Sequence, residues 1–237
     1  MIFRQLFDYD TWTYTYLLAD AQRGEAVLID AVLEQLERDV ALLNELGLTL
    51  KYVFDTHVHA DHVTASGALR ERTGCKVGVS AQGGVDCADL QLKEGDQFAF
   101  GAHRIDVLET PGHTDSCLSF VCGDRVFTGD ALFVRGCGRT DFQQGDAGKL
   151  YDSIVGKLYA LPDITQVYPG HDYRGMSCST IGEEKRHNPR VRLGRDGFIQ
   201  LMAQLNLAYP KKIDVAVPAN LLCGKAVDGG VVAGRAM

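Results

Sequence analysis

The chain lacks any apolar run long enough to cross a membrane or to form the core of a signal peptide. Its first eight residues, Met-Ile-Phe-Arg-Gln-Leu-Phe-Asp, also lack the Arg-rich and Ser-rich character of an organelle transit peptide. The sequence therefore predicts a cytoplasmic protein with no membrane partner. A processed protein of the mitochondrial matrix would show the same features.

An excess of basic residues is also missing. The 24 Lys and Arg residues are outnumbered by 31 Asp and Glu residues, which gives a formal net charge of -7. Because a phosphate backbone is bound through clustered Lys and Arg, we expect no nucleic acid partner. With 46% hydrophobic and 23% charged residues, the composition is typical of a globular protein that can bury a core.

Closely spaced cysteine pairs are absent from the sequence as well. The seven cysteines are scattered singly, without a Cys-x-x-Cys pair, and their number is odd. This pattern predicts free thiols in a reducing compartment and not a disulfide framework. Cys223, beside Gly224, is a residue of interest if the protein handles sulfur, although its role stays open.

The hydrophobic pattern predicts strands and helices that alternate along the chain. Residues 2–8, 12–19 and 25–30 are strand-like runs separated by polar turns, which predicts an antiparallel meander. Further strands are predicted at 51–55, 76–79, 96–100, 104–109, 117–122, 125–128 and 166–168. Helices are predicted at 36–46, 63–73 and 148–161, and from an N-cap at Asp196 to residue 205. We expect one domain over residues 1–225, with two sheets flanked by helices, and a disordered tail over 226–237.

Histidine is scarce, yet three of the seven histidines fall within residues 56–62, which read Thr-His-Val-His-Ala-Asp-His. This loop follows a predicted buried strand and precedes a predicted helix, a position at which side chains converge on a crevice. His57 and His59 can point the same way if the loop stays extended, and Asp61 and His62 follow as the chain turns. Imidazole and carboxylate are ligands for zinc, iron or manganese, so the loop predicts a metal site.

Three more strand ends present a side chain that can bind a metal. Tight turns with Pro-Gly or Gly place His113, Asp130 and His171 directly beyond the predicted strands at 104–109, 125–128 and 166–168. The order His, His, Asp and His over four strand ends is a specific pattern, whereas a lone Thr-Gly-Asp would carry no information.

The His-x-His-x-Asp-His loop, followed by a His, an Asp and a last His, resembles the metallo-β-lactamase superfamily over about residues 10–175. The resemblance implies an α/β fold, namely an αββα sandwich of two mixed sheets flanked by helices, with the metal site at one edge of the sheets. It also supplies ligand positions for two metal ions, and the spacing alone leaves open how many are filled.

The segments between these residues resemble the persulfide dioxygenases of the ETHE1 type within that superfamily, and extend the match to about residue 224. The segments are residues 136–145, 171–173, 181–184, 188–190 and 217–220. The related glyoxalase II enzymes usually show a Phe-Glu-Gly type segment where this chain reads Arg-Thr-Asp-Phe. They also have a longer helical carboxyl-terminal domain, so both differences point away from them.

The resemblance implies one Fe(2+) per chain, held by His57, His113 and Asp130. Two imidazoles and one carboxylate on one face of iron leave positions for substrate and dioxygen. The remaining residues of the pattern would orient these ligands or bound water; they are His59, Asp61, His62 and His171.

The implied reaction converts glutathione persulfide, dioxygen and water to sulfite and glutathione, a step of sulfide catabolism. Glutathione carries two carboxylates, and the family-like segments offer Arg139, Tyr173 and Arg190 to bind it. Arg139 could equally form an ion pair with Asp141 or Asp146, and Arg190 could belong to a solvated basic face.

Two alternatives remain. The first is a dinuclear zinc hydroxyacylglutathione hydrolase on the same scaffold, and the second is a non-catalytic protein that binds a metal or glutathione. The complete ligand set speaks against the second. Trp12 and the tyrosines that follow it are interpreted as core and surface material, which leaves a homodimer open.

Overall fold

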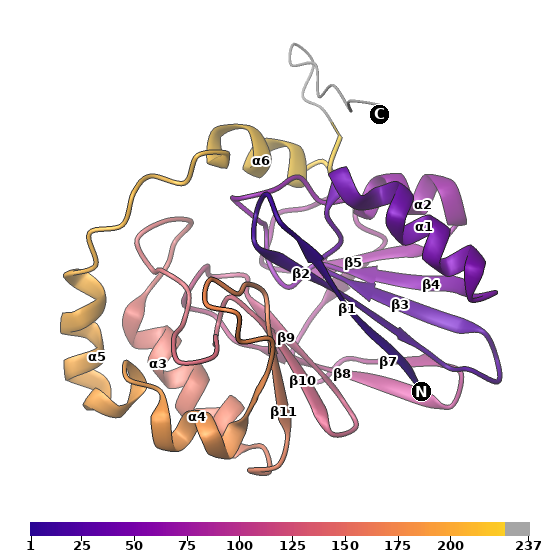
Figure 1. Ribbon diagram of the computed structural model, residues 1–237. Helices are drawn as coiled ribbons and strands as arrows, with labels where there is room; N and C mark the ends of the chain where they lie inside the picture. Colours follow the sequence, from indigo (N-terminus) through magenta and orange to yellow (C-terminus); the bar gives the residue numbers. More distant parts are fainter. Residues whose placement is uncertain (226–237) are drawn as a thin grey trace.

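The predicted meander of residues 2–30 forms one end of a six-stranded mixed sheet in the computed structural model, which describes residues 1–225 (Figure 1). The first two pairs, β1–β2 and β2–β3, are antiparallel, and the later neighbours are parallel. In order across the sheet, the strands are Ile2–Asp8 (β1), Thr13–Ala19 (β2), Glu25–Ile29 (β3), Thr49–Phe54 (β4), Lys76–Ser80 (β5) and Leu90–Leu92 (β6).

A second mixed sheet of six strands packs against the first. Its order is β12-β11-β10-β9-β8-β7, and only the β10–β11 pair is parallel. The strands are Gln97–Phe100 (β7), His103–Glu109 (β8), Leu118–Cys122 (β9), Arg125–Gly129 (β10), Gln166–Pro169 (β11) and Ser179–Thr180 (β12).

Helices cover the outer face of each sheet, which gives four layers in the order helix, sheet, sheet, helix (Figure 1). Leu36–Glu45 (α1) and Ser66–Thr73 (α2) pack Leu43 and Leu69 against the first sheet. Ala147–Gly156 (α3), Ile181–His187 (α4) and Gly194–Ala203 (α5) share an apolar cluster with the second sheet. Ile213–Asn220 (α6) follows, and short 3-10 turns lie at Leu33–Gln35, Leu158–Ala160 and Val191–Leu193. The αββα sandwich predicted from the sequence is confirmed.

The two sheets hold each other through a buried aromatic layer. Tyr16 of β2 lies 4.9 Å from Phe127 of β10, measured between ring centroids, and Phe54 of β4 stacks on Phe120 of β9 at 5.3 Å. All four rings are buried. Because the rings come from both sheets, neither sheet can form its apolar face without the other.

Several details of the predicted elements were wrong. Helix α5 begins at Gly194, so Asp196 is not its N-cap but lies in its first turn. Helix α2 begins at Ser66 and not at 63, because the Thr64 hydroxyl bonds to Asp55 and to Ser66. Strands β6 and β12, of three and two residues, were not predicted.

The prediction of free thiols was wrong for two cysteines. Cys87 and Cys223 form a disulfide across 136 residues of sequence, while the other five cysteines are free. The two cysteines meet only in the folded chain, so their spacing in the sequence does not predict the disulfide. The tail predicted to be disordered, residues 226–237, lies outside the described residues.

Within residues 1–225, none of the helices is both long enough and apolar enough to pass through a membrane.

Candidate metal centre

The metal-binding candidates lie where four strands end at one edge of the sandwich. The loop of residues 56–62 follows β4, Asp130 follows β10, His171 follows β11 and His113 follows β8 after a short turn. The edge is closed by backbone hydrogen bonds between the sheets, from Leu118 to the Thr56 carbonyl at 2.7 Å and from Tyr14 to the Gly170 carbonyl at 2.9 Å. Potential ligand atoms of His57, His113 and Asp130 all lie within 4.8 Å of one another.

His57 is oriented by a hydrogen-bond chain that runs away from the cavity. Its Nδ1 lies 3.0 Å from the Thr56 hydroxyl, and that hydroxyl donates to Oδ2 of Asp30 at 2.9 Å. The Thr56 oxygen can therefore accept from Nδ1–H, which leaves the lone pair on Nε2. Burial and the neighbouring His59 hold the pKa of His57 well below its usual range, so this imidazole is neutral and able to bind a metal.

The ring of His113 is also oriented by a hydrogen bond through Nδ1. Its Nδ1 donates to the Arg139 carbonyl at 2.6 Å, so Nε2 carries the lone pair, and Nε2 lies 3.6 Å from Oδ2 of Asp130. The preceding residue, Gly112, has a φ of 139°, and a Cβ there would lie 2.2 Å from the Leu150 nitrogen. Only glycine fits the turn that delivers His113 against α3.

Asp130 offers one oxygen to the cavity because the other is taken. Its Oδ1 accepts from Nδ1 of His171 at 2.7 Å, which leaves Oδ2 facing His113. Burial opposes ionisation of Asp130, but the charge of His171 and its hydrogen bond outweigh it and hold the pKa of Asp130 well below its usual value. The carboxylate is ionised, as a metal ligand requires.

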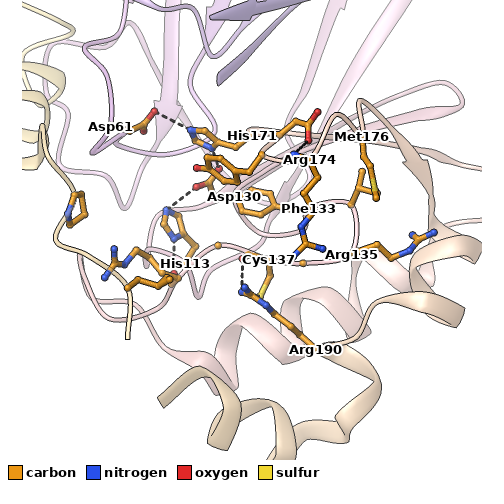
Figure 2. Close-up of a pocket in the computed structure, with 18 of the residues that line it drawn as sticks. Asp61, His113, Asp130, Phe133, Arg135, Cys137, His171, Arg174, Met176 and Arg190 are labelled. Atoms are coloured by element: carbon orange, nitrogen blue, oxygen red, sulfur yellow. Dashed lines mark hydrogen bonds and ion pairs between the residues drawn. The ribbon is translucent and has the colours of Figure 1, made fainter. Parts of the chain in front are cut away.

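His171 lies between two carboxylates (Figure 2). Besides Asp130, it contacts Oδ2 of Asp61 at 3.0 Å through Nε2. Burial alone would lower the pKa of His171, but the two carboxylates outweigh it and raise that pKa well above 6.5. With both ring nitrogens donating, His171 has no lone pair for a metal ion in this arrangement.

His59, Asp61 and His62 form a second cluster. Oδ2 of Asp61 is contacted by His62, by His171 and by the Thr13 hydroxyl, each at 3.0 Å. Nδ1 of His59 and Nε2 of His62, however, are buried without a hydrogen-bond partner. These two nitrogens are the feature of the cluster that a second metal ion could use.

A cavity of about 450 Å³ opens onto Asp130 and the histidines (Figure 2). It is lined by all three residues predicted to bind glutathione, Arg139, Tyr173 and Arg190. Arg139 is held by both oxygens of Asp141, at 2.6 and 2.7 Å, so the structural ion pair considered from the sequence exists. Tyr173 stacks on His171 with ring centroids 5.6 Å apart and is 61% exposed.

Arg190 is half-buried beneath the cavity, where Nη1 donates to the Cys137 carbonyl at 2.9 Å. No carboxylate pairs with it in the described part of the chain, so its charge remains available to an anion. Arg135, by contrast, is paired with Glu183 and Glu184. Arg190 itself is half-buried, unlike a residue of the solvated basic face considered for it, whereas its neighbours Arg186 and Arg192 are exposed.

Several residues that shape the centre were not predicted. Thr56 and Asp30 orient His57, and Asn220 holds the histidine loop from α6. The cavity wall also includes Phe133, Arg174, Met176, Leu207 and Pro210. Asp30 lies at the end of a predicted strand as Asp130 does, which was a usable signal. Asn220 ends the family-like segment 217–220, but the sequence does not show that this segment lies against the histidine loop.

These candidate ligands at one edge of a four-layered sandwich are typical of a metallo-β-lactamase domain, and the chain belongs to that superfamily. The family model described as the metallo-beta-lactamase superfamily matches residues 13–171. Within the superfamily, the chain belongs to the ETHE1 persulfide dioxygenases, since mitochondrial relatives of that name are 48% to 49% identical over 94% of this chain.

The match to this group covers nearly the whole chain. The mitochondrial persulfide dioxygenase ETHE1 of Mus musculus is 49% identical over 227 residues, which is 94% of this chain and 89% of the relative. The crystal structure of ETHE1 from Myxococcus xanthus superposes with a TM-score of 0.93 at 59% identity, covering 95% of this chain and 100% of that one. A hydroxyacylglutathione hydrolase of Roseobacter denitrificans is less similar, at 31% identity over 87% of this chain and 81% of the relative.

Proposed function

We propose that this chain is a mononuclear iron persulfide dioxygenase that converts glutathione persulfide, dioxygen and water to sulfite and glutathione. The number of iron ions, one per chain, is inferred from the position of His171. Because its two nitrogens are bonded to Asp130 and Asp61, it is withdrawn from metal binding, as is the Asp61 oxygen that it contacts. The convergent set whose three members all line the cavity is His57, His113 and Asp130.

The chemistry of this set fits ferrous iron. It offers two neutral imidazole nitrogens and one carboxylate oxygen, the donor set of non-haem iron oxygenases. Ferrous iron bound there would supply the one-electron chemistry through which the persulfide sulfur, the net electron donor, reduces dioxygen. The partners behind each ligand, Thr56, the Arg139 carbonyl and His171, fix its orientation and choose the ring nitrogen that faces the cavity.

The cavity residues bind the glutathione part of the substrate. A volume of about 450 Å³ falls within the range of small-molecule sites. Arg190 provides an uncompensated positive charge for one carboxylate, and the exposed Tyr173 hydroxyl provides a donor near His171. Arg139 keeps its charge balanced by Asp141, so it contributes hydrogen bonds more than net charge.

The zinc hydrolase alternative has one observation in its favour, the unpartnered Nδ1 of His59 and Nε2 of His62. A second metal ion there would also need a carboxylate, and Oδ2 of Asp61 is already bonded to His171, His62 and the Thr13 hydroxyl, while His59 and His62 do not line the cavity. The dioxygenase proposal is therefore the better supported one. A homodimer, and the cytoplasm or mitochondrial matrix as the compartment, stay predictions.

The deciding experiment measures oxygen uptake by protein that has been loaded anaerobically with ferrous iron. With glutathione persulfide we expect one sulfite formed per dioxygen consumed, and with S-lactoylglutathione no thioester cleavage. Metal analysis should find about one iron per chain. Thioester cleavage without oxygen uptake, together with about two zinc ions per chain, would refute the proposal.

The same assay with cysteine persulfide tests the role given to the cavity. Cysteine persulfide carries the same reactive sulfur but lacks most of the groups that the cavity would hold. A clearly higher KM for cysteine persulfide is the expected result, and equal KM values would remove glutathione from the proposal while leaving the dioxygenase chemistry intact.

A further inference from the structure

The segment after α5 runs past the cavity of the metal centre and leads back to the first sheet. Residues 204–212 pass along the cavity, where Leu207 and Pro210 line its wall and the Ala208 carbonyl accepts from Arg139 at 2.7 Å. Helix α6 then lies near α1 and α2 (Figure 1). Its Ala216 and Ala219 form an apolar cluster with Val63, directly after the histidine loop.

Asn220, the last residue of α6, makes two hydrogen bonds to this loop and one to Thr64, which follows it. Its amide nitrogen donates to the His59 carbonyl and to the His62 carbonyl, both at 2.9 Å. Its amide oxygen accepts from the Thr64 backbone at 2.8 Å. The side chain is only 4% exposed, so both donor hydrogens and the acceptor are used within the protein.

These bonds fix backbone groups that the loop cannot satisfy by itself. The stretch between β4 and α2 forms no regular ladder, and a buried carbonyl without a partner costs free energy. The carbonyls of His59 and His62 are held at both ends of the turn that follows His57. A change at residue 220 therefore acts on a metal ligand through the loop backbone, over 160 residues away in the sequence.

The disulfide holds Asn220 in place against the first sheet. Cys223 lies three residues after Asn220 and donates its backbone N–H to the Asn220 carbonyl at 3.1 Å. Its own carbonyl accepts from Gly67 of α2 at 2.9 Å, where a Cβ on residue 67 would come within 2.4 Å of that oxygen. The bond to Cys87 ties this end of the chain to the loop between β5 and β6.

We propose that Asn220 is a positioning residue for the metal-binding loop, and that the Cys87–Cys223 disulfide keeps it in register with that loop. The inference rests on the proposed function only in that residues 56–62 contribute the ligand His57. It assigns a role in metal retention to a helix outside residues 13–171, the part matched by the family model.

The first test replaces the amide by a carboxylate of the same shape, Asn220→Asp. The variant keeps the acceptor for Thr64 but faces two carbonyls with an oxygen instead of a donor. We expect metal release to a chelator to become about tenfold to 100-fold faster, as for other groups that orient metal ligands. In the iron-loaded variant kcat should fall while KM for the persulfide stays within about twofold.

Asn206→Asp is the matched control, because Asn206 is exposed in the segment that leads to α6. It introduces the same chemical change and should leave metal release unaltered. The visible absorption of the cobalt-substituted proteins gives a readout of ligand geometry independent of turnover. An Asn220→Asp protein with the release rate and cobalt spectrum of the Asn206→Asp protein would show that the inference is wrong.

The second test removes the disulfide and leaves Asn220 in place, through Cys87→Ser. Cys178→Ser is its control, because Cys178 is a free and exposed thiol. Cys87→Ser should speed metal release several-fold, and dithiothreitol should produce the same change in the wild type but none in Cys87→Ser. In that reduction the S–S bond breaks, Cys87 and Cys223 each take up a proton, and the two thiols of the reductant become its own disulfide.

The outcomes for the two proposals can be told apart. If the wild type binds metal but consumes no oxygen with glutathione persulfide, the proposed function fails while the comparison of release rates still decides the role of Asn220. If the wild type is an active dioxygenase and all four variants release metal at its rate, only the positioning role is refuted. If Cys87→Ser alone behaves as the wild type, the disulfide has no part in it.

Discussion

At the scale of single residues, His171 engages one oxygen of each of two carboxylates in the centre. A histidine with a carboxylate on each ring nitrogen is held as a cation, and it neutralises part of the charge of Asp61 and Asp130. One oxygen of Asp130 remains for a metal ion. The same residue type that is proposed to bind metal at His57 and His113 thus serves at residue 171 to orient Asp130.

Replacing Asp130 tests its place in the ligand set. In Asp130→Ala the carboxylate ligand is lost and His171 keeps only Asp61 as an anionic partner, so we expect less than about a tenth of the wild-type iron and no oxygen uptake. Metal analysis after gel filtration measures the first and an oxygen electrode the second. Asp115→Ala, at an exposed position near His113, is the control and should retain iron. Wild-type iron content in Asp130→Ala would remove Asp130 from the ligand set.

At the scale of elements, the edge opposite the metal centre is held by two turns. The carboxylate of Asp20, at the end of β2, accepts from Gln22 and Arg23 in its own turn, at 2.8 and 2.9 Å. It also accepts from Ala102 in the turn between β7 and β8, at 2.6 Å. Because these turns belong to different sheets, one carboxylate ties the two layers together.

This contact predicts a pH-dependent contribution to stability. The bond from Ala102, with those from Arg23 and Gln22, lowers the pKa of Asp20 to about 2. A lowered pKa means that the stabilisation is present above the unfolded value of 3.8 and is lost as pH falls toward 2. Asp20→Asn should therefore lower the urea midpoint of the metal-free protein at pH 7, and by less at pH 3. A difference that does not shrink with acid would contradict the assignment.

The elements that the sequence predicted well are those with a regular period and a glycine or proline at their ends. The first three strands, α1 and the strands around residues 97–129 follow their predicted ranges within a few residues. The two strands that were missed, β6 and β12, are too short to show a period. At α5, the apolar spacing was read correctly but Asp196 was taken for a cap because it precedes the first apolar residue.

At the scale of the molecule, the predicted ligands could be grouped because carboxyl ends of strands meet at one edge. That rule does not predict contacts between segments that are distant in the sequence and do not end a strand. The three bonds of Asn220 span more than 150 residues each, and the disulfide spans 136. Only the packing of α6 against the first sheet brings these groups together, so neither contact could be read from sequence.

The shared aromatic layer predicts that both sheets unfold as one unit. Phe120 of β9 is fully buried against Phe54 of β4, so Phe120→Ala should lower the free energy of unfolding by about 3 to 5 kcal/mol. Trp12 fluorescence reports on the first sheet and far-UV circular dichroism on both, and their urea transitions should shift together. Ile164→Ala, at a side chain 80% exposed, is the control and should change stability by less than about 0.5 kcal/mol. A variant in which the Trp12 transition stays in place while the circular dichroism transition moves would show that the second sheet unfolds alone.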